Sequence, residues 1–198
     1  IRKNLPKNKS LIGLVGGPST LYHFAPRYND NDPLLLGLFL KTIDNILTLN
    51  IDIQLKSDLD LLMIFDTEAN KLTDDEFKSK VIPFIKKQSE RHPNKIGYFT
   101  KNITTSKYKM LKELEDLKLT VLGSNIDILN ELDKTHLSLQ GNFSNELFNI
   151  EDKNKFKSVL GEFIHYINDF DSSQRAGWIS SLDHGVQKTT PEANVHIF

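Results

Sequence analysis

Cysteine is absent from this sequence of 198 residues. Its absence excludes disulfide bonds, thiolate nucleophiles, and zinc or iron–sulfur sites with cysteine ligands. Histidine is present but scattered, without the HExxH spacing or any other cluster of metal ligands, at His23, His92, His136, His165, His184 and His196. We therefore expect no metal site.

An excess of charge of either sign is also lacking, because the net charge is -1 and the pI is about 6.7. Such a balance gives no general reason to expect a nucleic-acid or membrane partner. No apolar run approaches the roughly 20 residues of a transmembrane helix, and no signal peptide opens the chain. We therefore predict a soluble protein with neither kind of partner.

Short apolar segments alternate with helical patterns along the whole chain. The predicted strands are 11–15, 61–65, 95–100, 119–122, 136–140 and 177–182. Helical spacing is found over 34–55, 73–85, 106–117, 126–132 and 152–170, and Asp32 and Thr73 are predicted to cap the first two helices. We read residues 1–198 as one α/β domain with a parallel sheet.

Two architectures fit these six strand–helix units. A doubly wound sheet of six strands would use the chain as it stands, whereas a (β/α)8 barrel needs eight strands and about 250 residues. The first strand is followed by GLVGGPST, which is neither GxGxxG nor a Walker A sequence. The sequence therefore lacks the motif that would best support a dinucleotide-binding or ATP-binding site.

A histidine follows the last predicted strand. Asp183, His184 and Gly185 form a predicted turn after WISSL, and Thr190 and Pro191 are read as the N-cap and first position of a helix. Ligands bind at the carboxyl ends of strands in parallel α/β folds, and histidine titrates near neutral pH. His184 is thus a candidate for chemistry, with hydrogen bonding within the loop as the alternative. His165 lies inside a predicted helix and is read as structural or exposed.

Four segments together resemble the C-terminal two-thirds of the uroporphyrinogen decarboxylase family. They are LIGLVGGPSTL, LLMIFDTEANKLTDDEFKSKVIPFIKK, LSLQGNFSNELF and SSLDHGVQKTTPEANV, in the family's order and at similar separations. The resemblance implies a (β/α)8 barrel of the TIM type, with about six of its eight units in this chain. The first two strands, the aspartate that handles the pyrrole nitrogens and the arginines that bind substrate carboxylates would precede Ile1.

The resemblance also assigns site residues. His184 matches the family's active-site histidine, although Asp183 replaces a glycine of its Gly-His-Gly. Thr67 stands where the family has a substrate-contacting serine, and Phe65 matches the aromatic residue two positions before that serine. Phe24 falls on the position of an active-site tyrosine and lacks the phenol, unless Tyr22 supplies one. Asn125 stands where the family has an aspartate.

The implied reaction removes the acetate carboxyl groups of uroporphyrinogen III to give coproporphyrinogen III in haem biosynthesis. It needs no cofactor and no metal. The substrate-binding set would be Phe24, Phe65, Thr67 and His184, with His184 also catalytic. Arg27, Lys101 and Lys188 follow strand ends and could assist carboxylate binding, although solvated loop charges are the simpler interpretation. The family further implies a homodimer in the cytoplasm, with a plastid as another location.

Two rival interpretations remain. A degenerate paralogue or partner subunit could keep the barrel for assembly, since the phenol and one glycine are lost. Corrinoid-linked methyltransferases share the barrel but hold zinc through His and Cys, and the absence of cysteine argues against them.

Overall fold

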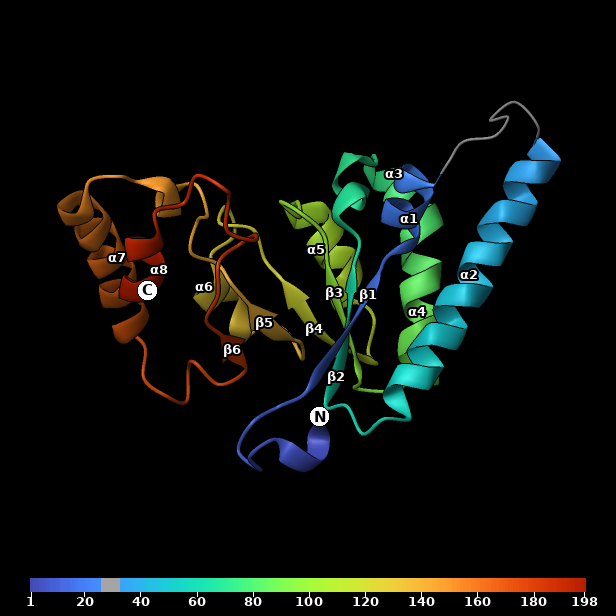
Figure 1. Cartoon of the computed structure of the whole chain (residues 1–198), viewed down its shortest axis with the longest axis horizontal. Coiled ribbons are helices and arrows are strands. Elements are labelled where there is room, and N and C mark those ends of the chain that lie inside the picture. Colours follow the sequence, from blue (N-terminus) through green and yellow to red (C-terminus); the bar gives the residue numbers. More distant parts are fainter. Residues whose placement is uncertain (26–32) are drawn as a thin grey trace. The chain divides into compact units, whose positions relative to one another are not determined.

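The computed structural model describes residues 1–25 and 33–198. Six strands alternate with helices, as predicted (Figure 1). The strands are β1 (Ile12–Gly16), β2 (Leu61–Phe65), β3 (Ile96–Phe99), β4 (Leu117–Val121), β5 (Ser138–Gln140) and β6 (Trp178–Ile179). The helices are α1 (Pro18–Phe24), α2 (Pro33–Leu55), α3 (Asp74–Glu76), α4 (Ile82–Arg91), α5 (Thr105–Lys112), α6 (Ile128–Leu132), α7 (Lys153–Asn168) and α8 (Glu192–Ile197). Short 3-10 turns are η1 (Arg2–Asn4), η2 (Thr67–Lys71) and η4 (Leu147–Asn149), and η3 (Phe77–Val81) is a π turn.

The chain divides into two compact units, and strand β4 contributes residues to both. The first unit comprises residues 1–101 and 106–119, and the second comprises 102–105 and 120–198. The strand order is β1-β2-β3-β4 in the first unit and β4-β5-β6 in the second, so sequential strands are neighbours. Pairing is parallel between β1 and β2, β2 and β3, and β5 and β6. The expected α/β fold is therefore confirmed. A single domain over 1–198 stays a prediction.

The core of the first unit lies between its strands and two helices. Helices α2 and α4 run along one face of β1, β2 and β3 (Figure 1). The inward residues of α2 recur at helical spacing, as Ile43, Leu47 and Ile51, and all three are buried. Strand β2 is buried over its first four residues, which is typical of a parallel strand covered on both faces. Its fifth residue, Phe65, emerges at the carboxyl end.

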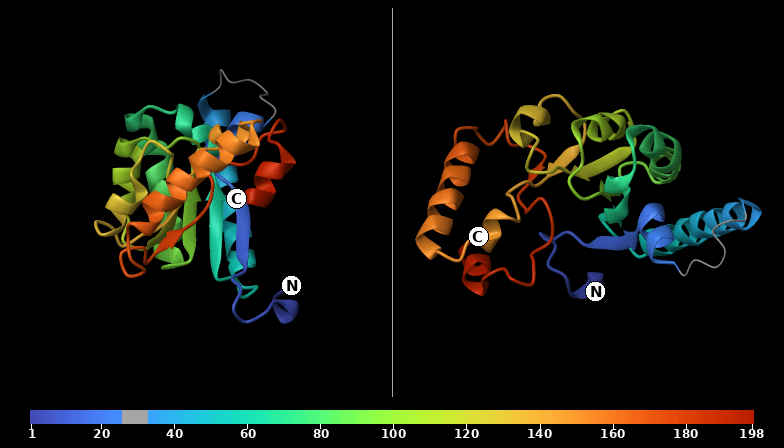
Figure 2. Two further views of the ribbon diagram at one scale, coloured as in Figure 1. Left: turned by 90° about the vertical axis from the view of Figure 1, so that its left-hand side faces the viewer. Right: turned by 90° about the horizontal axis from the view of Figure 1, so that it is seen from above.

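Aromatic side chains build the core of the second unit. Phe143, Phe148 and Phe156 are buried with Leu160, and their rings meet edge to face. Edge-to-face contacts add to the free energy gained by burying aromatic surface. Helices α7 and α8 pack together beside this cluster and can be followed in Figure 2. The loops after β5 and β6 thereby take part in this core, through Phe143 and Leu182 respectively.

Local predictions are confirmed at one helix start and wrong at another. Thr73 Oγ1 accepts from the Glu76 N–H at 3.2 Å and the Glu76 carboxylate accepts from the Thr73 N–H at 3.0 Å, which forms the predicted capping box. Thr190 does not cap the last helix, whose N-cap is Pro191. The Thr190 hydroxyl instead donates to Asn149 Oδ1 at 2.6 Å. The expected cap at Asp32 lies outside the described residues.

The observed element boundaries differ most from the predicted ones where apolar residues fit both helical spacing and a buried strand. The helix predicted over 106–117 ends at Lys112, and β4 begins at Leu117. The last strand is shorter than predicted, although Leu182 still forms an isolated bridge with Phe143. His165 is exposed on α7, as expected. None of the helices in the described part of the chain, α2 included, is both long and apolar enough to cross a membrane.

Candidate active site

The carboxyl end of β1 leads directly into α1, which carries Phe24. The turn is made by Gly16, Gly17 and Pro18, with Pro18 at the first helical position. Phe24 is the last residue of α1 and is 73% exposed. It borders a shallow hollow of about 340 Å³ between α1 and α2, lined by Leu21, Phe24, Ala25, Phe39, Ile43 and Ile46. Tyr22 points its ring toward Phe39, with centroids 6.1 Å apart.

Phe65 and Thr67 lie at the carboxyl end of β2. Phe65 is the last residue of the strand, and its ring centroid is 5.2 Å from that of Phe99 on β3. Thr67 begins η2 and is partly buried. Helix α1 packs against η2, so Phe24, Phe65 and Thr67 lie on neighbouring elements of the first unit.

Asp66, between these two residues, was not singled out from the sequence. Its side chain is fully buried, and its Oδ1 accepts from the Thr20 N–H at 2.7 Å. Burial raises the pKa of Asp66, and hydrogen bonds from Thr20, Ser19 and Tyr98 act in the opposite direction. The sequence did contain a signal for this residue, because an acidic side chain directly follows the five apolar residues Leu61–Phe65 without an intervening glycine or proline.

The carboxylate of Glu68 lies near basic side chains at the same end of the sheet. Its Oε2 lies 2.5 Å from Lys71 Nζ and 3.5 Å from His23 Nε2. The hydrogen bond from Lys71 lowers the pKa of Glu68 against the effect of burial, and the charges of His23, Lys71 and Lys101 lower it further. Of the proposed carboxylate-binding residues, Lys101 is thus close enough to act on this group. Lys188 is exposed, and Arg27 lies outside the described residues.

His184 occupies the predicted turn in the second unit. It is partly buried, with Nδ1 3.3 Å from the Gly185 carbonyl oxygen. The preceding Asp183 is only 4% exposed, and its Oδ1 accepts from the Asn145 N–H at 2.8 Å. The carboxylate that replaces the family's glycine therefore joins the loop after β6 to the loop after β5. A pocket shared by His184, Thr67 and Phe24 stays a prediction.

A hollow of about 660 Å³ opens beside the carboxyl ends of β4 and β5 in the second unit. Asn125 and Asn142 both line it, with Asp127 and Tyr166. The amide of Asn142 is held by the carbonyl oxygens of Gly123 at 2.8 Å and Ile126 at 2.6 Å. Tyr166 donates to Asp127, so helix α7 is tied to the loop before α6.

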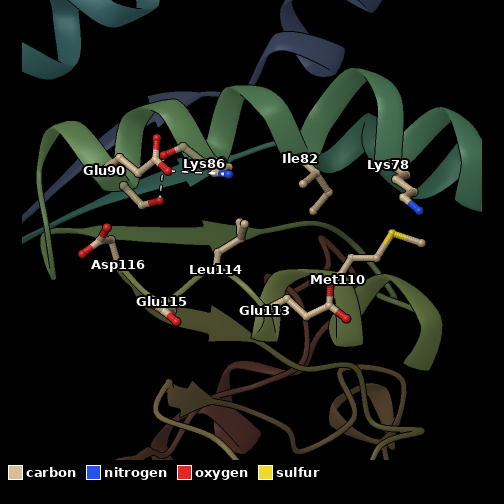
Figure 3. A pocket seen from close by; sticks show the side chains of 10 residues that line it. Lys78, Ile82, Lys86, Glu90, Met110, Glu113, Leu114, Glu115 and Asp116 are labelled. Carbon is tan, nitrogen blue, oxygen red and sulfur yellow. Dashed lines mark hydrogen bonds and ion pairs between the residues drawn. The ribbon is translucent and has the colours of Figure 1, made fainter.

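Another hollow, of about 450 Å³, lies between α4 and residues 110–116 (Figure 3). Ile82, Met110 and Leu114 point into it, while Lys86 and Glu90 pair along the edge of α4. Its lining contains none of the predicted site residues, and all of it lies in the first unit. No group of three His, Asp or Glu side chains suited to a metal ion is found within residues 1–25 and 33–198.

Comparison with known proteins identifies the family. The family model for uroporphyrinogen decarboxylase (URO-D) matches residues 1–198. The uroporphyrinogen decarboxylase of Orientia tsutsugamushi (strain Ikeda) is 32% identical over all of this chain and 61% of its own length. That of Rickettsia bellii is 30% identical, over 98% of this chain and 60% of its own length. The chain thus spans about three-fifths of these curated relatives.

Among solved structures, a methyltransferase from Methanosarcina mazei superposes with a TM-score of 0.74. The match covers 98% of this chain and 58% of that one at 14% sequence identity, which supports the fold alone. The six strand–helix units are accordingly part of a (β/α)8 barrel fold of the decarboxylase type. From the match to its whole length and the identity to these relatives, the chain belongs to the uroporphyrinogen decarboxylase family.

Proposed function

We propose that this chain carries part of the active site of a uroporphyrinogen decarboxylase. The substrate would be uroporphyrinogen III, whose four acetate side chains lose their carboxyl groups to give coproporphyrinogen III. The observation that supports this most is the position of Phe65, Thr67 and His184, each at or just after the carboxyl end of a parallel strand. Substrates of (β/α)8 enzymes bind at that end.

The chemistry asks three things of a protein. Protonation of the pyrrole carbon beside an acetate makes the ring an iminium, which accepts the electron pair when the bond to the carboxylate breaks and carbon dioxide leaves. The methylene carbon then takes a proton to become a methyl group, and the ring returns its own. A protein must therefore stabilise positive charge on the ring, hold the remaining carboxylates and deliver protons. No metal or organic cofactor enters this proposal.

The residues of this chain would divide these tasks. His184 carries a nitrogen that can donate a hydrogen bond to a substrate carboxylate or pass a proton. Thr67 offers a hydroxyl to the substrate, and Phe65 and Phe24 offer flat apolar surface to the macrocycle. Lys101 would add positive charge near β3. We further propose a homodimer in the cytoplasm, which sedimentation and fractionation would check.

The test is turnover by the purified protein. Uroporphyrinogen III is supplied without oxygen, and the products are oxidised and separated by their number of carboxyl groups. We expect porphyrins with seven to four carboxyl groups. His184→Gln should lower kcat/KM by about a hundredfold, as expected for loss of an acid–base or charge-binding group. His165→Gln, on an exposed face of α7, is the matched control and should keep full activity.

A second function has one observation in its favour. Phe24 supplies no phenol, and its ring is largely exposed. A porphyrin-binding paralogue without turnover would tolerate that change. It would bind uroporphyrin, and His184→Gln would weaken binding, yet no decarboxylated product would form. An absence of both binding and turnover would exclude both proposals.

A further inference from the structure

Asp66 is a buried acidic residue between two proposed substrate contacts, and the decarboxylation scheme does not use it. Its side chain is fully buried at the carboxyl end of β2. Its backbone is engaged as well, because the N–H donates to the Phe99 carbonyl at 2.8 Å and the carbonyl accepts from the Ala69 N–H at 2.9 Å. The residue therefore belongs both to the sheet and to the first turn of η2.

The carboxylate of Asp66 is surrounded by hydrogen-bond donors from two other elements. Oδ1 accepts from the Thr20 N–H at 2.7 Å, and Oδ2 lies 3.4 Å from the Tyr98 hydroxyl, which donates to it. Hydrogen bonding by the hydroxyls of Ser19 and Thr20 also lowers the pKa of the carboxylate. Thr20 Oγ1 in turn accepts from the Glu68 N–H at 3.1 Å. The first turn of α1 is thus fastened to the start of η2 at several points.

The packing around Asp66 is equally restrictive. Gly17 lies so close that a Cβ atom there would be 2.3 Å from the Asp66 Cβ. Such a distance is far inside van der Waals contact, so α1 can approach the end of β2 only with glycine at this position. The Thr20 N–H can only donate, so an amide at position 66 would have to keep its single carbonyl oxygen toward Thr20 and would place its NH2 group where an oxygen now accepts from Tyr98.

We propose that Asp66 is a positioning residue that holds α1 against η2 and thereby fixes Phe24 relative to Phe65 and Thr67. The substrate is the tetrapyrrole of the proposed function, on which this inference rests. Asp66 itself is buried and does not touch the substrate. Its effect is transmitted through the backbone of α1, which begins at the Asp66 bonds and ends at Phe24.

The experiment compares three variants of the whole protein. Asp66→Asn removes the negative charge and one of the two acceptor oxygens, and Ser19→Ala removes one hydroxyl while leaving the fold less perturbed. Ser79→Ala is the control, because the Ser79 hydroxyl on η3 donates to the Asp75 carbonyl at 2.7 Å and to the Glu76 carbonyl at 3.3 Å, both in the preceding α3. Hydrogen exchange of the Thr20 amide measures the anchor. Fluorescence quenching of uroporphyrin measures binding, and steady-state kinetics separates kcat from KM.

We expect Asp66→Asn to speed exchange at Thr20 and to weaken uroporphyrin binding about tenfold, the size expected for losing a hydrogen bond to a charged group. KM should rise by a similar factor while kcat changes little. Ser19→Ala should change Thr20 exchange, binding and KM in the same direction and more weakly. If Asp66→Asn does not fold, the Ser19→Ala result tests the proposal by itself. Ser79→Ala should match the wild type.

Unchanged exchange at Thr20 in both variants would disprove the anchor. Faster exchange with wild-type affinity and KM would show that the anchor is structural only, which also overturns the proposal. Failure of the proposed function looks different, because the wild-type protein itself would then neither bind uroporphyrin nor decarboxylate uroporphyrinogen. In that case the role of Asp66 in tetrapyrrole binding is overturned together with it.

Discussion

The carboxylate of Asp52 on α2 contacts two side chains at the end of α4, those of Arg91 and His92. Its oxygens accept from Arg91 Nε at 2.8 Å and Nη2 at 2.6 Å, and Oδ1 lies 2.7 Å from His92 Nε2. The hydrogen bond from Arg91 lowers the pKa of Asp52 far below its usual value, against the effect of burial, and the bond with His92 lowers it further. The Asp52 side chain is only 17% exposed, so solvent screens these contacts less than at the surface.

Replacing Asp52 by asparagine should therefore lower the free energy of unfolding by about 1–2 kcal/mol at pH 7. The folded-state pKa lies below the unfolded one, so this stability is present above about pH 4 and is lost as the pH falls further. Urea unfolding at pH 7 and pH 3 should show the difference between the two proteins shrinking in acid. Asp44→Asn, which removes the ion pair with Lys87, should lower the free energy of unfolding at pH 7 by less than Asp52→Asn does. A difference that persists at pH 3 would contradict this account.

Asp183 gives a second prediction at the scale of one residue. Asp183→Gly makes the loop more like the family's Gly-His-Gly, but it deprives the Asn145 N–H of its acceptor. We expect the free energy of unfolding to fall by about 1–3 kcal/mol, because this partly buried N–H is left without an acceptor. Thermal unfolding measures the change in stability, and hydrogen exchange at the Asn145 amide reports the loss of its hydrogen bond. Asp183→Asn keeps a carbonyl oxygen in place and should lower the free energy of unfolding by less than Asp183→Gly. Equal stability of Asp183→Gly and the wild type would refute the role assigned to this bond.

At the scale of elements, η2 depends on a buried lysine from α5. Lys107 is 3% exposed, and its Nζ donates to the carbonyl oxygens of Leu72 at 2.6 Å and Asn70 at 3.0 Å. These are carbonyls at the end of η2, which lack partners within so short a helix. Burial lowers the pKa of Lys107, while Asp74 and Glu76 act in the opposite direction. The lysine thus holds the segment that begins with Thr67.

Lys107→Met keeps the length of the side chain and removes the donors. We expect the unfolding free energy to fall by about 1–3 kcal/mol, because buried carbonyls lose their partner. Amide exchange over residues 67–72 should become faster. Lys109→Met, on an exposed position of the same helix, is the control and should change neither quantity. Protection of η2 that survives Lys107→Met would show that other contacts hold it.

Secondary structure was predictable where one pattern dominated. The run LLMIF could only be a buried strand, and Thr73 with Glu76 predicted a helix start that is present. The end of α5 was misplaced because Leu111, Leu114 and Leu117 satisfy helical spacing while Leu117 is already in β4. Thr190 was misread because its hydroxyl bonds to Asn149, which is remote in the sequence.

The candidate site was predictable only in part, because its contacts also join residues that are remote in the sequence. Resemblance to the family pointed to Phe24, Phe65, Thr67 and His184, and each lies at or after a strand end. Asp66 was missed because its burial depends on Gly17 and Thr20, which come from the turn and helix after another strand. A pattern read along the chain contains no information about such a contact. Whether His184 joins the other three still rests on the resemblance.

At the scale of the whole molecule, strand β4 contributes residues to both compact units. Unfolding either unit would remove hydrogen-bonded neighbours of this strand, so we expect one cooperative transition. Trp178, the only tryptophan, lies in the second unit, and its indole N–H donates to the Gly141 carbonyl at 2.7 Å.

Trp178 fluorescence should therefore report damage to the first unit. Lys107→Met should shift the urea midpoint seen by Trp178 as far as the midpoint seen by circular dichroism. Lys109→Met should leave both unchanged. A Trp178 transition that stays in place while the circular dichroism curve moves would mean that the two units unfold independently.

The enclosure of Lys107 also has a chemical consequence. An ammonium group that is covered by protein and bonded to carbonyl oxygens is a poor target for acylating reagents, whereas the exposed Lys109 on the same helix is an open one. In native protein treated briefly with an acetylating reagent, the ratio of label at these two positions would record how often η2 separates from α5. Mass spectrometry of one tryptic region would then follow local breathing without any engineered probe.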